Sequence, residues 1–366
     1  MLGVSIISLI ILLGVLIFAH EVGHFLVAKY SGVGVLKFSL GFGPRLIGKK
    51  VGETEYLISL IPLGGYVKLL GESQDDELSE EDKKRSFLKQ PVSKRIAIVA
   101  AGPIFNFLLA IVIFTIVYMI GVPTLTTYIG GVQEGSSAYD AGIKEGDMII
   151  AIDGKEITRW EILAERISKS EGKELRVTIK RDELTRDVSL KPRMLKTQNI
   201  FGEEIESYKI GVSPSSQHTV TESMNPLMAF WTGLKQTWNI SKLTVLSVIK
   251  IFEGAISPKT LGGPILIAQI AGAQVKEGII PFVFFMALLS INLAILNLFP
   301  IPILDGGHLL FFFIEIITGK EINIKWREMA QQIGFVLLVI LMLFVFIIDI
   351  ERLNLSFDNI NKIFSR

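Results

Sequence analysis

The chain has 366 residues, of which 50% are hydrophobic, with a net charge of +1 and a mean hydropathy of +0.50. This hydropathy is too high for an ordinary soluble protein of this length, so the composition indicates a membrane protein. The balanced charge gives no sign of a nucleic-acid partner. Because the chain contains no cysteine, disulfides and thiolate ligands are excluded.

Four segments lack charged residues over a length that can cross a bilayer, whose hydrocarbon core of about 30 Å takes roughly 20 helical residues. They are residues 1–19, 96–123, 279–304 and 329–348. The first has neither the basic start nor the small-residue cleavage site of a secretory signal, so we expect it to be retained. We therefore predict a polytopic α-helical membrane protein with four transmembrane segments.

Basic residues are concentrated between the first and second segments and again between the third and fourth. The positive-inside rule places both regions in the cytoplasm, which leaves residues 124 to about 278 outside. We expect a multi-pass protein of the inner (plasma) membrane in contact with the lipid bilayer.

The first cytoplasmic region is more than a linker. The stretches "VLKFSLGFGPRL" and "TEYLISLIPLGGYVKLLG" mix β-branched and aromatic residues with glycine and proline. This pattern predicts short strands joined by turns. We expect a small membrane-associated β-structure within residues 31–95.

Residues 124–200 change character, since "MIIAIDG" and "ELRVTIKR" predict strands on either side of a helix near Trp160–Ser168. The segment "GGVQEGSSAYDAGIKEGDMIIAIDGKEI" resembles a circularly permuted PDZ (α+β) domain, which would bind peptide or protein termini by strand addition. A single copy is visible. A polar linker follows, in which we interpret His218 as an exposed loop residue.

Residues 226–253 combine apolar residues at helical spacing with Trp231, Trp238 and several lysines. An amphipathic helix of this kind suits a membrane surface. Packing on the PDZ-like domain is an equally good interpretation.

The motif "HEVGH" places His20 and His24 four residues apart at the end of the first apolar segment. On a helix these two imidazoles share one face and can bind one ion. Glu21 flanks the ion, where it can take a proton from water bound to a zinc ion. Contacts between these side chains and lipid headgroups are the alternative, but a charge at mid-membrane costs about 2.5–3.5 kcal/mol and so requires a function.

A third ligand is needed, because catalytic zinc usually has three protein ligands. The stretch "NLFPIPILDGGHLL" offers Asp305 after two prolines that forbid a regular helix. Irregular backbone at membrane depth is tolerated where it lines an enclosed cavity. We prefer Asp305 to its rival His308, and we interpret Glu315 as a packed or interfacial acid.

Together these motifs make the chain similar to the site-2 proteases, which are intramembrane zinc metalloproteases, and to their RseP-like members in particular. The matching stretches are "HEVGH", "FSLGFGP", "IPLGGYVKL", "AGPIFNFLLA", "LGGPILIAQIAG" and "NLFPIPILDGG". The resemblance implies zinc ligation by His20, His24 and Asp305, with Glu21 as the general base. It also implies substrate contacts by Asn297, Gly64, Gly65, Tyr66 and Val67.

The substrate role of the β-structure has a physical reason, because an unwound transmembrane segment needs partners for its freed amides, and an edge strand supplies them. Helix capping or an interhelical hydrogen bond is the alternative for Asn297. We interpret Asn106 as a packing contact between helices. Many Gram-negative relatives have two PDZ domains, so the single copy here weakens any borrowed scheme of substrate gating.

The resemblance implies a zinc metalloendopeptidase that cuts single-pass membrane proteins, such as anti-sigma factors in a stress response or signal-peptide remnants, after prior trimming by another protease. A silent membrane scaffold and a divalent-metal transporter are the alternatives, although a transporter should show internal repeats. Two histidines and one aspartate could also hold iron or cobalt.

The predicted layout divides the chain into nine parts. They are a first transmembrane helix with the H-E-x-x-H motif (1–30), the β-region and loop (31–95), a second transmembrane helix (96–123), the PDZ-like domain (124–200), a linker with the amphipathic helix (201–278), a third transmembrane segment (279–304), the LDG motif, helix and cytoplasmic turn (305–328), a fourth transmembrane helix (329–350) and a tail (351–366).

Overall fold

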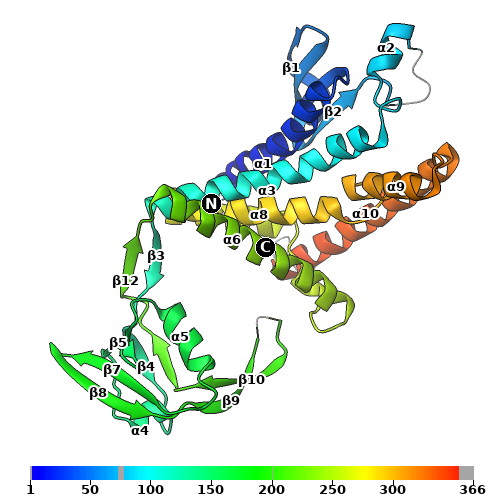
Figure 1. Ribbon diagram of the computed structural model, residues 1–366. Coiled ribbons are helices and arrows are strands. Elements are labelled where there is room, and N and C mark those ends of the chain that lie inside the picture. Colours follow the sequence, from blue (N-terminus) through cyan, green and yellow to red (C-terminus); the bar gives the residue numbers. More distant parts are fainter. Residues whose placement is uncertain (1, 73–77, 200, 354–366) are drawn as a thin grey trace, which may run out of the picture. The chain divides into compact units, whose positions relative to one another are not determined.

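The computed structural model describes residues 2–72, 78–199 and 201–353 (Figure 1). The chain forms two compact units. The first contains residues 1–116, 230–248 and 257–366, and the second contains residues 117–229 and 249–256. The predicted tail, 351–366, lies mostly outside the described residues.

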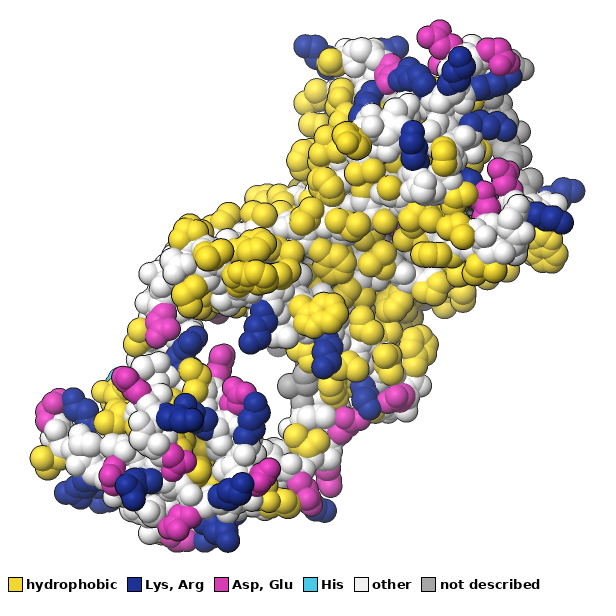
Figure 2. All heavy atoms as spheres, viewed as in Figure 1, with side chains coloured by type: hydrophobic (Ala, Val, Ile, Leu, Met, Phe, Trp, Pro, Cys, Tyr) yellow, Lys and Arg dark blue, Asp and Glu magenta, His cyan; other side chains and the backbone are white. Residues whose placement is uncertain are grey.

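The four predicted transmembrane segments are helical. They are α1 (Leu2–Tyr30), α3 (Val92–Ile120), α8 (Ile279–Leu298) and α10 (Ile324–Arg352). Each of these four helices, among the described residues, is long and apolar enough to cross a membrane. Their outer faces keep large apolar side chains exposed, such as Leu337 and Phe335 on α10. Figure 2 shows this apolar surface over the helices, with charged side chains gathered at the end that carries α2 (Glu80–Arg85).

The predicted β-structure consists of two long, bent strands, β1 (Val35–Val51) and β2 (Thr54–Leu69). Residues 37–40 of β1 pair with residues 65–68 along one edge and with residues 55–58 along the other. Gly41 has a φ of +94°, and a Cβ there would lie 2.8 Å from the carbonyl oxygen of Ile61, so only glycine fits this bend. Residues 65–69 consequently form an outer strand, which pairs only with β1 among the described residues.

Two shorter helices complete the helical part of the first unit, α7 (Pro264–Glu277) beside α1 and α9 (Asp305–Thr318) after α8. A short 3₁₀ turn (Pro258–Thr260) precedes α7. The carboxylate of Asp349 accepts hydrogen bonds from the amides of Gly263, Ile265 and Leu266. Because these amides begin α7 and lack partners inside the helix, Asp349 caps α7 and ties it to the end of α10.

The amphipathic segment is a helix, α6 (Pro226–Phe252), as predicted. Its central part belongs to the first unit: Gly233 lies against Thr115 of α3, and Thr244 donates to Asn292 of α8. Trp231 and Trp238 remain exposed. The central part of α6 therefore packs on the apolar helices rather than on the PDZ-like region.

The second unit is an α+β structure around the sheet β6-β5-β7-β8. Its apolar core includes Ile149, Leu163, Val177 and Ile179. The elements, in chain order, are β3 (Val122–Leu125), β4 (Ile129–Val132), α4 (Ser137–Asp140), β5 (Met148–Ile152), β6 (Lys155–Glu156), α5 (Trp160–Ser168), β7 (Leu175–Arg181), β8 (Leu184–Leu190), β9 (Arg193–Gln198), β10 (Glu204–Lys209), β11 (Val212–Pro214) and β12 (Thr219–Glu222).

An ion pair joins the residue before β5 to the last residue of β7. Asp147 is 1% exposed and accepts two hydrogen bonds from the guanidinium of Arg181. Burial alone would raise the pKa of Asp147, but the Arg181 guanidinium outweighs it and holds that pKa below its usual value.

The second unit extends beyond the predicted range 124–200. Strand β11 pairs with β4, and β12 pairs with β3, so residues predicted as a linker close the fold. His218 lies between these strands, stacked on Tyr128 with ring centroids 4.1 Å apart. The local polar pattern gave no sign of these long-range pairings, which join residues far apart in the sequence.

Candidate metal centre

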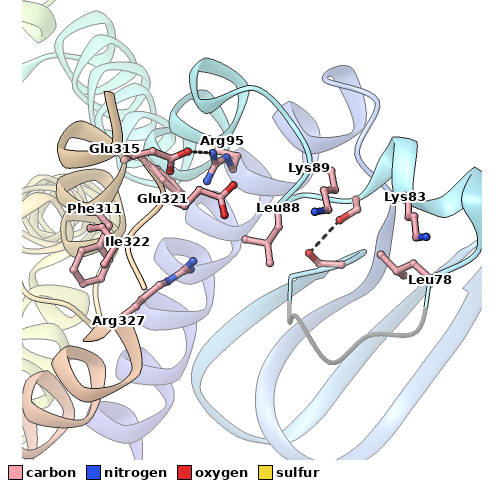
Figure 3. Close-up of a pocket in the computed structure, with 13 residues that line it drawn as sticks. Leu78, Lys83, Leu88, Lys89, Arg95, Phe311, Glu315, Glu321, Ile322 and Arg327 are labelled. Carbon is pink, nitrogen blue, oxygen red and sulfur yellow. Dashed lines mark hydrogen bonds and ion pairs between the residues drawn. The ribbon is translucent and has the colours of Figure 1, made fainter. Parts of the chain in front are cut away.

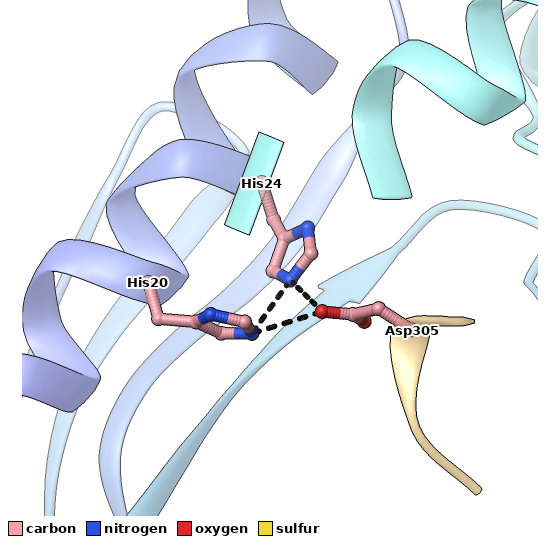
Figure 4. Close-up of side chains that lie close together, drawn as sticks. All are labelled: His20, His24 and Asp305. Atoms are coloured by element: carbon pink, nitrogen blue, oxygen red, sulfur yellow. Dashed lines mark hydrogen bonds and ion pairs between the residues drawn. The ribbon is translucent and has the colours of Figure 1, made fainter. Parts of the chain in front are cut away.

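Three of the predicted ligands meet in the first unit. His20 and His24 from α1 and Asp305 from the start of α9 bring their ligand atoms within 4.8 Å of one another (Figure 4). The Asp305 Oδ2 lies 3.1 Å from His20 Nε2 and 3.6 Å from His24 Nε2, and the two Nε2 atoms are 3.2 Å apart. Residues 285 positions apart in the sequence thus share one small polar site.

These distances suit a tetrahedral zinc ion. Zinc–nitrogen and zinc–oxygen bonds of about 2.0–2.1 Å at a tetrahedral angle set ligand atoms roughly 3.3 Å apart. The Oδ2 of Asp305 is also buried and has no hydrogen-bond partner among the described residues. Three lone pairs at this separation repel one another unless protons or a metal cation lie between them. The donor set and its spacing therefore fit zinc.

Helix α3 lies against both imidazoles. The carbonyl oxygen of Ile98 is 2.8 Å from Nδ1 of His24 and accepts its proton, which leaves the Nε2 lone pair free for a metal. A Cβ at Gly102 would lie 2.4 Å from His24 Nε2 and 2.7 Å from His20 Cε1. Pro103 removes one helical hydrogen bond beside these residues. The stretch "AGPIFNF" thus allows close contact between α3 and the two histidines.

The break between α8 and α9 positions Asp305. Helix α8 ends at Leu298, and α9 begins at Asp305, as the two prolines predicted. A Cβ at Gly306 would lie 2.2 Å from the carbonyl oxygen of Phe299, and one at Gly307 would lie 2.3 Å from that of Ile301. Both glycines therefore let α9 fold back onto the irregular segment. Asp305, in the first turn of α9, also benefits from the positive end of the helix dipole.

Glu21 is 9% exposed and lies next to the outer strand of the β-structure. A Cβ at Gly65 would lie 2.9 Å from Cγ of Glu21 and 2.8 Å from the carbonyl oxygen of Ser39. A Cβ at Gly64 would overlap the ring of Phe42, which stacks on Tyr66. The two glycines therefore allow the strand to approach both the acid and the aromatic pair.

The structure also describes the positions of three further residues that the sequence analysis considered. Nδ2 of Asn297, in the last turn of α8, lies 3.5 Å from Nε2 of His20. His308 is outside the ligand cluster, and its Nδ1 faces Arg327 at 3.2 Å. Glu315 is a packed acid, paired with Arg95 at 2.5 Å.

Sequence reasoning missed the contributions of α3. Asn106 is fully buried, and its Nδ2 lies 3.4 Å from Nδ1 of His20, so it contacts a candidate ligand rather than only a neighbouring helix. The available signal was a polar residue inside an apolar segment, four residues after Gly102, because such residues usually serve a function.

A cavity of about 430 Å³ lies near the start of α3 (Figure 3). Its lining includes Lys89, Arg95, Glu315, Glu321 and Arg327, but none of the three candidate ligands. The guanidinium of Arg95 pairs with Glu315 and lies 5.0 Å from the ring centroid of Phe312. The cavity is thus polar and mixed in charge, and it is separate from the ligand cluster.

Comparison with known proteins identifies the family. A family model described as "Peptidase family M50" matches residues 8–341. The chain belongs to peptidase family M50. It is therefore a zinc metalloprotease of the site-2 protease family. Zinc is its cofactor, and it is a membrane protein.

Similar proteins span almost the whole M50 chain. A "Putative zinc metalloprotease" of Rhizobium meliloti is 35% identical over 359 residues, covering 94% of this chain and 96% of the relative. Another protein with that description, from Clostridium acetobutylicum, is 36% identical over 351 residues, covering 94% and 97%. "Protease RseP" of Yersinia pestis is 31% identical over 450 positions, covering 95% and 99%. The last alignment is longer than the 366 residues of this chain, so RseP has inserted residues.

Substitution of Gly102 by alanine tests the contact between α3 and the imidazoles. The added methyl group would displace both rings, so we expect Gly102→Ala to lower zinc affinity on the order of 10- to 100-fold, measured by competition with a chelator. Gly14→Ala is the matched control, because a Cβ at this α1 glycine meets nothing within 4 Å. Equal affinities for the two variants would contradict the described packing.

Proposed function

We propose that His20, His24 and Asp305 hold the zinc ion of this M50 protease and that Glu21 is its general base. The convergence of the three ligand atoms within 4.8 Å carries this proposal. When bound, zinc supplies a Lewis acid that activates water and stabilises negative charge on the scissile carbonyl oxygen. Asn297, beside His20, holds the substrate backbone.

Glu21 transfers the protons in this proposal. Its carboxylate takes a proton from the attacking water and delivers it to the nitrogen of the leaving amine, which breaks the peptide bond without leaving an amide anion. Glu21 is buried and lies within electrostatic range of both histidines and Asp305. Adjacency to His20 in the sequence keeps it beside the metal and out of the ligand set.

Substitution of Glu21 by glutamine keeps the shape of the side chain and removes the base. We expect Glu21→Gln to bind zinc as the wild type does and to cut a single-pass membrane substrate at least about 10²-fold more slowly. Purified proteins at equal zinc content are compared by mass spectrometry of the products. Comparable cleavage by the two proteins would remove Glu21 from the mechanism.

The outer strand of the β-structure supports a mode of substrate binding. The Leu69 amide donates to Oε2 of Glu72, 3.2 Å away, rather than to β1. Because successive amides of a strand face opposite edges, the amides of Val67 and Gly65 face the same outer side as that of Leu69. Gly65 also lies against Glu21. In our proposal, an unwound substrate segment adds to residues 64–67 as a further strand beside the base.

Proline at position 67 tests this strand addition, because it removes an outward amide that the sheet does not use. Proline is tolerated at such edge positions, so we expect Val67→Pro to keep its zinc and to raise KM about tenfold, the effect of roughly 1.4 kcal/mol of lost binding. Val67→Ala shortens the same side chain but keeps the amide. If the alanine variant loses as much as the proline variant, packing rather than strand addition explains the effect.

We also propose that the second unit acts as a PDZ domain that reads or size-selects substrates. A groove of about 950 Å³ lies between α5 and strands β4, β10 and β11, with Trp160, Ala164 and Gly211 among its lining residues. Strand β11 pairs with β4 and has no second strand partner among the described residues, so a peptide could add to it. The substrates in this proposal are single-pass proteins trimmed beforehand, such as anti-sigma factors of a stress response.

Arginine at the exposed position Ala164 would fill this groove without disturbing the core. We expect Ala164→Arg to weaken binding of a short labelled peptide ending in valine on the order of tenfold, measured by fluorescence anisotropy with the full-length protein. Glu161→Arg is the control, since Glu161 is exposed on α5 outside the groove. If both variants bind the peptide with the same affinity, the peptide does not bind in this groove.

We propose that the protein lies in the inner membrane, with the metal site toward the cytoplasm and the second unit outside. The basic residues around the β-structure support this orientation. The cysteine-free chain allows a direct test with single cysteines at the exposed positions Glu145 and Lys84. A membrane-impermeant maleimide should label Glu145→Cys in intact spheroplasts. It should label Lys84→Cys only after the spheroplasts are lysed. The reverse pattern would invert the orientation.

A further inference from the structure

The face of α3 that meets α1 has three contacts with the metal site at intervals of four residues. The carbonyl of Ile98 binds His24, Gly102 lies against both imidazoles, and Asn106 faces His20. The first contact sets the tautomer of His24. His20 needs an equivalent partner, because a neutral imidazole that binds zinc through Nε2 must hold its proton on Nδ1.

Asn106 is the residue placed to be that partner. Its side chain is completely buried, Nδ2 lies 3.4 Å from Nδ1 of His20, and Oδ1 has no hydrogen-bond partner among the described residues. The backbone carbonyl of Asn106 also accepts the hydroxyl proton of Ser290 on α8, at 2.8 Å. This bond joins α3 to α8 at Asn106 through the backbone and leaves the side-chain amide group uninvolved.

With zinc on Nε2, the Nδ1–H of His20 would face the amide N–H₂ of Asn106, and two donors would oppose each other. A half-turn of the amide group exchanges its nitrogen and oxygen and turns this contact into a hydrogen bond. We propose that Asn106 is a positioning residue whose Oδ1 accepts the Nδ1 proton of His20 and so keeps the Nε2 lone pair directed at the metal. The proposal rests on zinc ligation by His20.

Three substitutions separate the hydrogen bond from packing. Asn106→Leu keeps the approximate shape but has no acceptor, so zinc affinity should fall on the order of 10- to 100-fold. Asn106→Asp keeps an acceptor and has no donor, so its affinity should stay within about threefold of the wild type. Ser290→Ala breaks the other hydrogen bond of the same residue without touching His20, and it should leave the affinity unchanged.

The measurement is competition for zinc between the purified full-length protein and a chelator, with cobalt absorption spectra as a second report on the ligand geometry. If Asn106→Asp loses as much affinity as Asn106→Leu, the amide acts as a donor and the proposal is wrong. If neither variant loses affinity, Asn106 only packs. His20→Ala is measured alongside. If it retains full zinc affinity, zinc ligation by His20 is wrong. If His20→Ala loses zinc affinity and Asn106→Leu does not, only the inference about Asn106 is wrong.

Discussion

Mutual repulsion among three electron-donor atoms is the constraint on which this structure depends. The Nε2 atoms of His20 and His24 and the Oδ2 of Asp305 lie between 3.1 and 3.6 Å apart, largely withdrawn from water. In a medium of low polarity such a group is stable only when protons or a metal cation lie between the three atoms. The surrounding helices bring the three atoms together, which supports the proposal that they hold the zinc ion.

Much of this arrangement depends on glycines, whose lack of a side chain allows neighbouring segments to come close. Gly102 lets α3 approach the imidazoles, Gly306 and Gly307 let α9 fold against the broken segment, and Gly65 lets the outer strand reach Glu21. Irregular backbone inside a membrane is costly unless protein or a wet cavity surrounds it. Here the irregular segment leads directly into the candidate ligand Asp305, and the outer strand lies against Glu21.

The sequence was sufficient for the elements whose signals are local. Four charge-free segments predicted α1, α3, α8 and α10, the spacing of His20 and His24 predicted a shared face, and two prolines predicted the break before Asp305. Contacts between distant segments were not predictable in this way. The interaction of α3 with the histidines and the closure of the second unit by β11 and β12 depend on which faces meet, and no local pattern encodes that. Zinc ligation by His20, His24 and Asp305 and the roles of Glu21, Asn297 and residues 64–67 remain predictions.

The most direct test of the account is the coordination of zinc itself. X-ray absorption at the zinc edge of the purified protein should show two imidazole nitrogens and carboxylate oxygen at about 2.0–2.2 Å. In Asp305→Ala the two imidazoles should remain while the carboxylate contribution disappears. An unchanged spectrum in Asp305→Ala, or a wild-type spectrum without paired imidazoles, would contradict the claim that residues from the two ends of the chain hold one zinc ion.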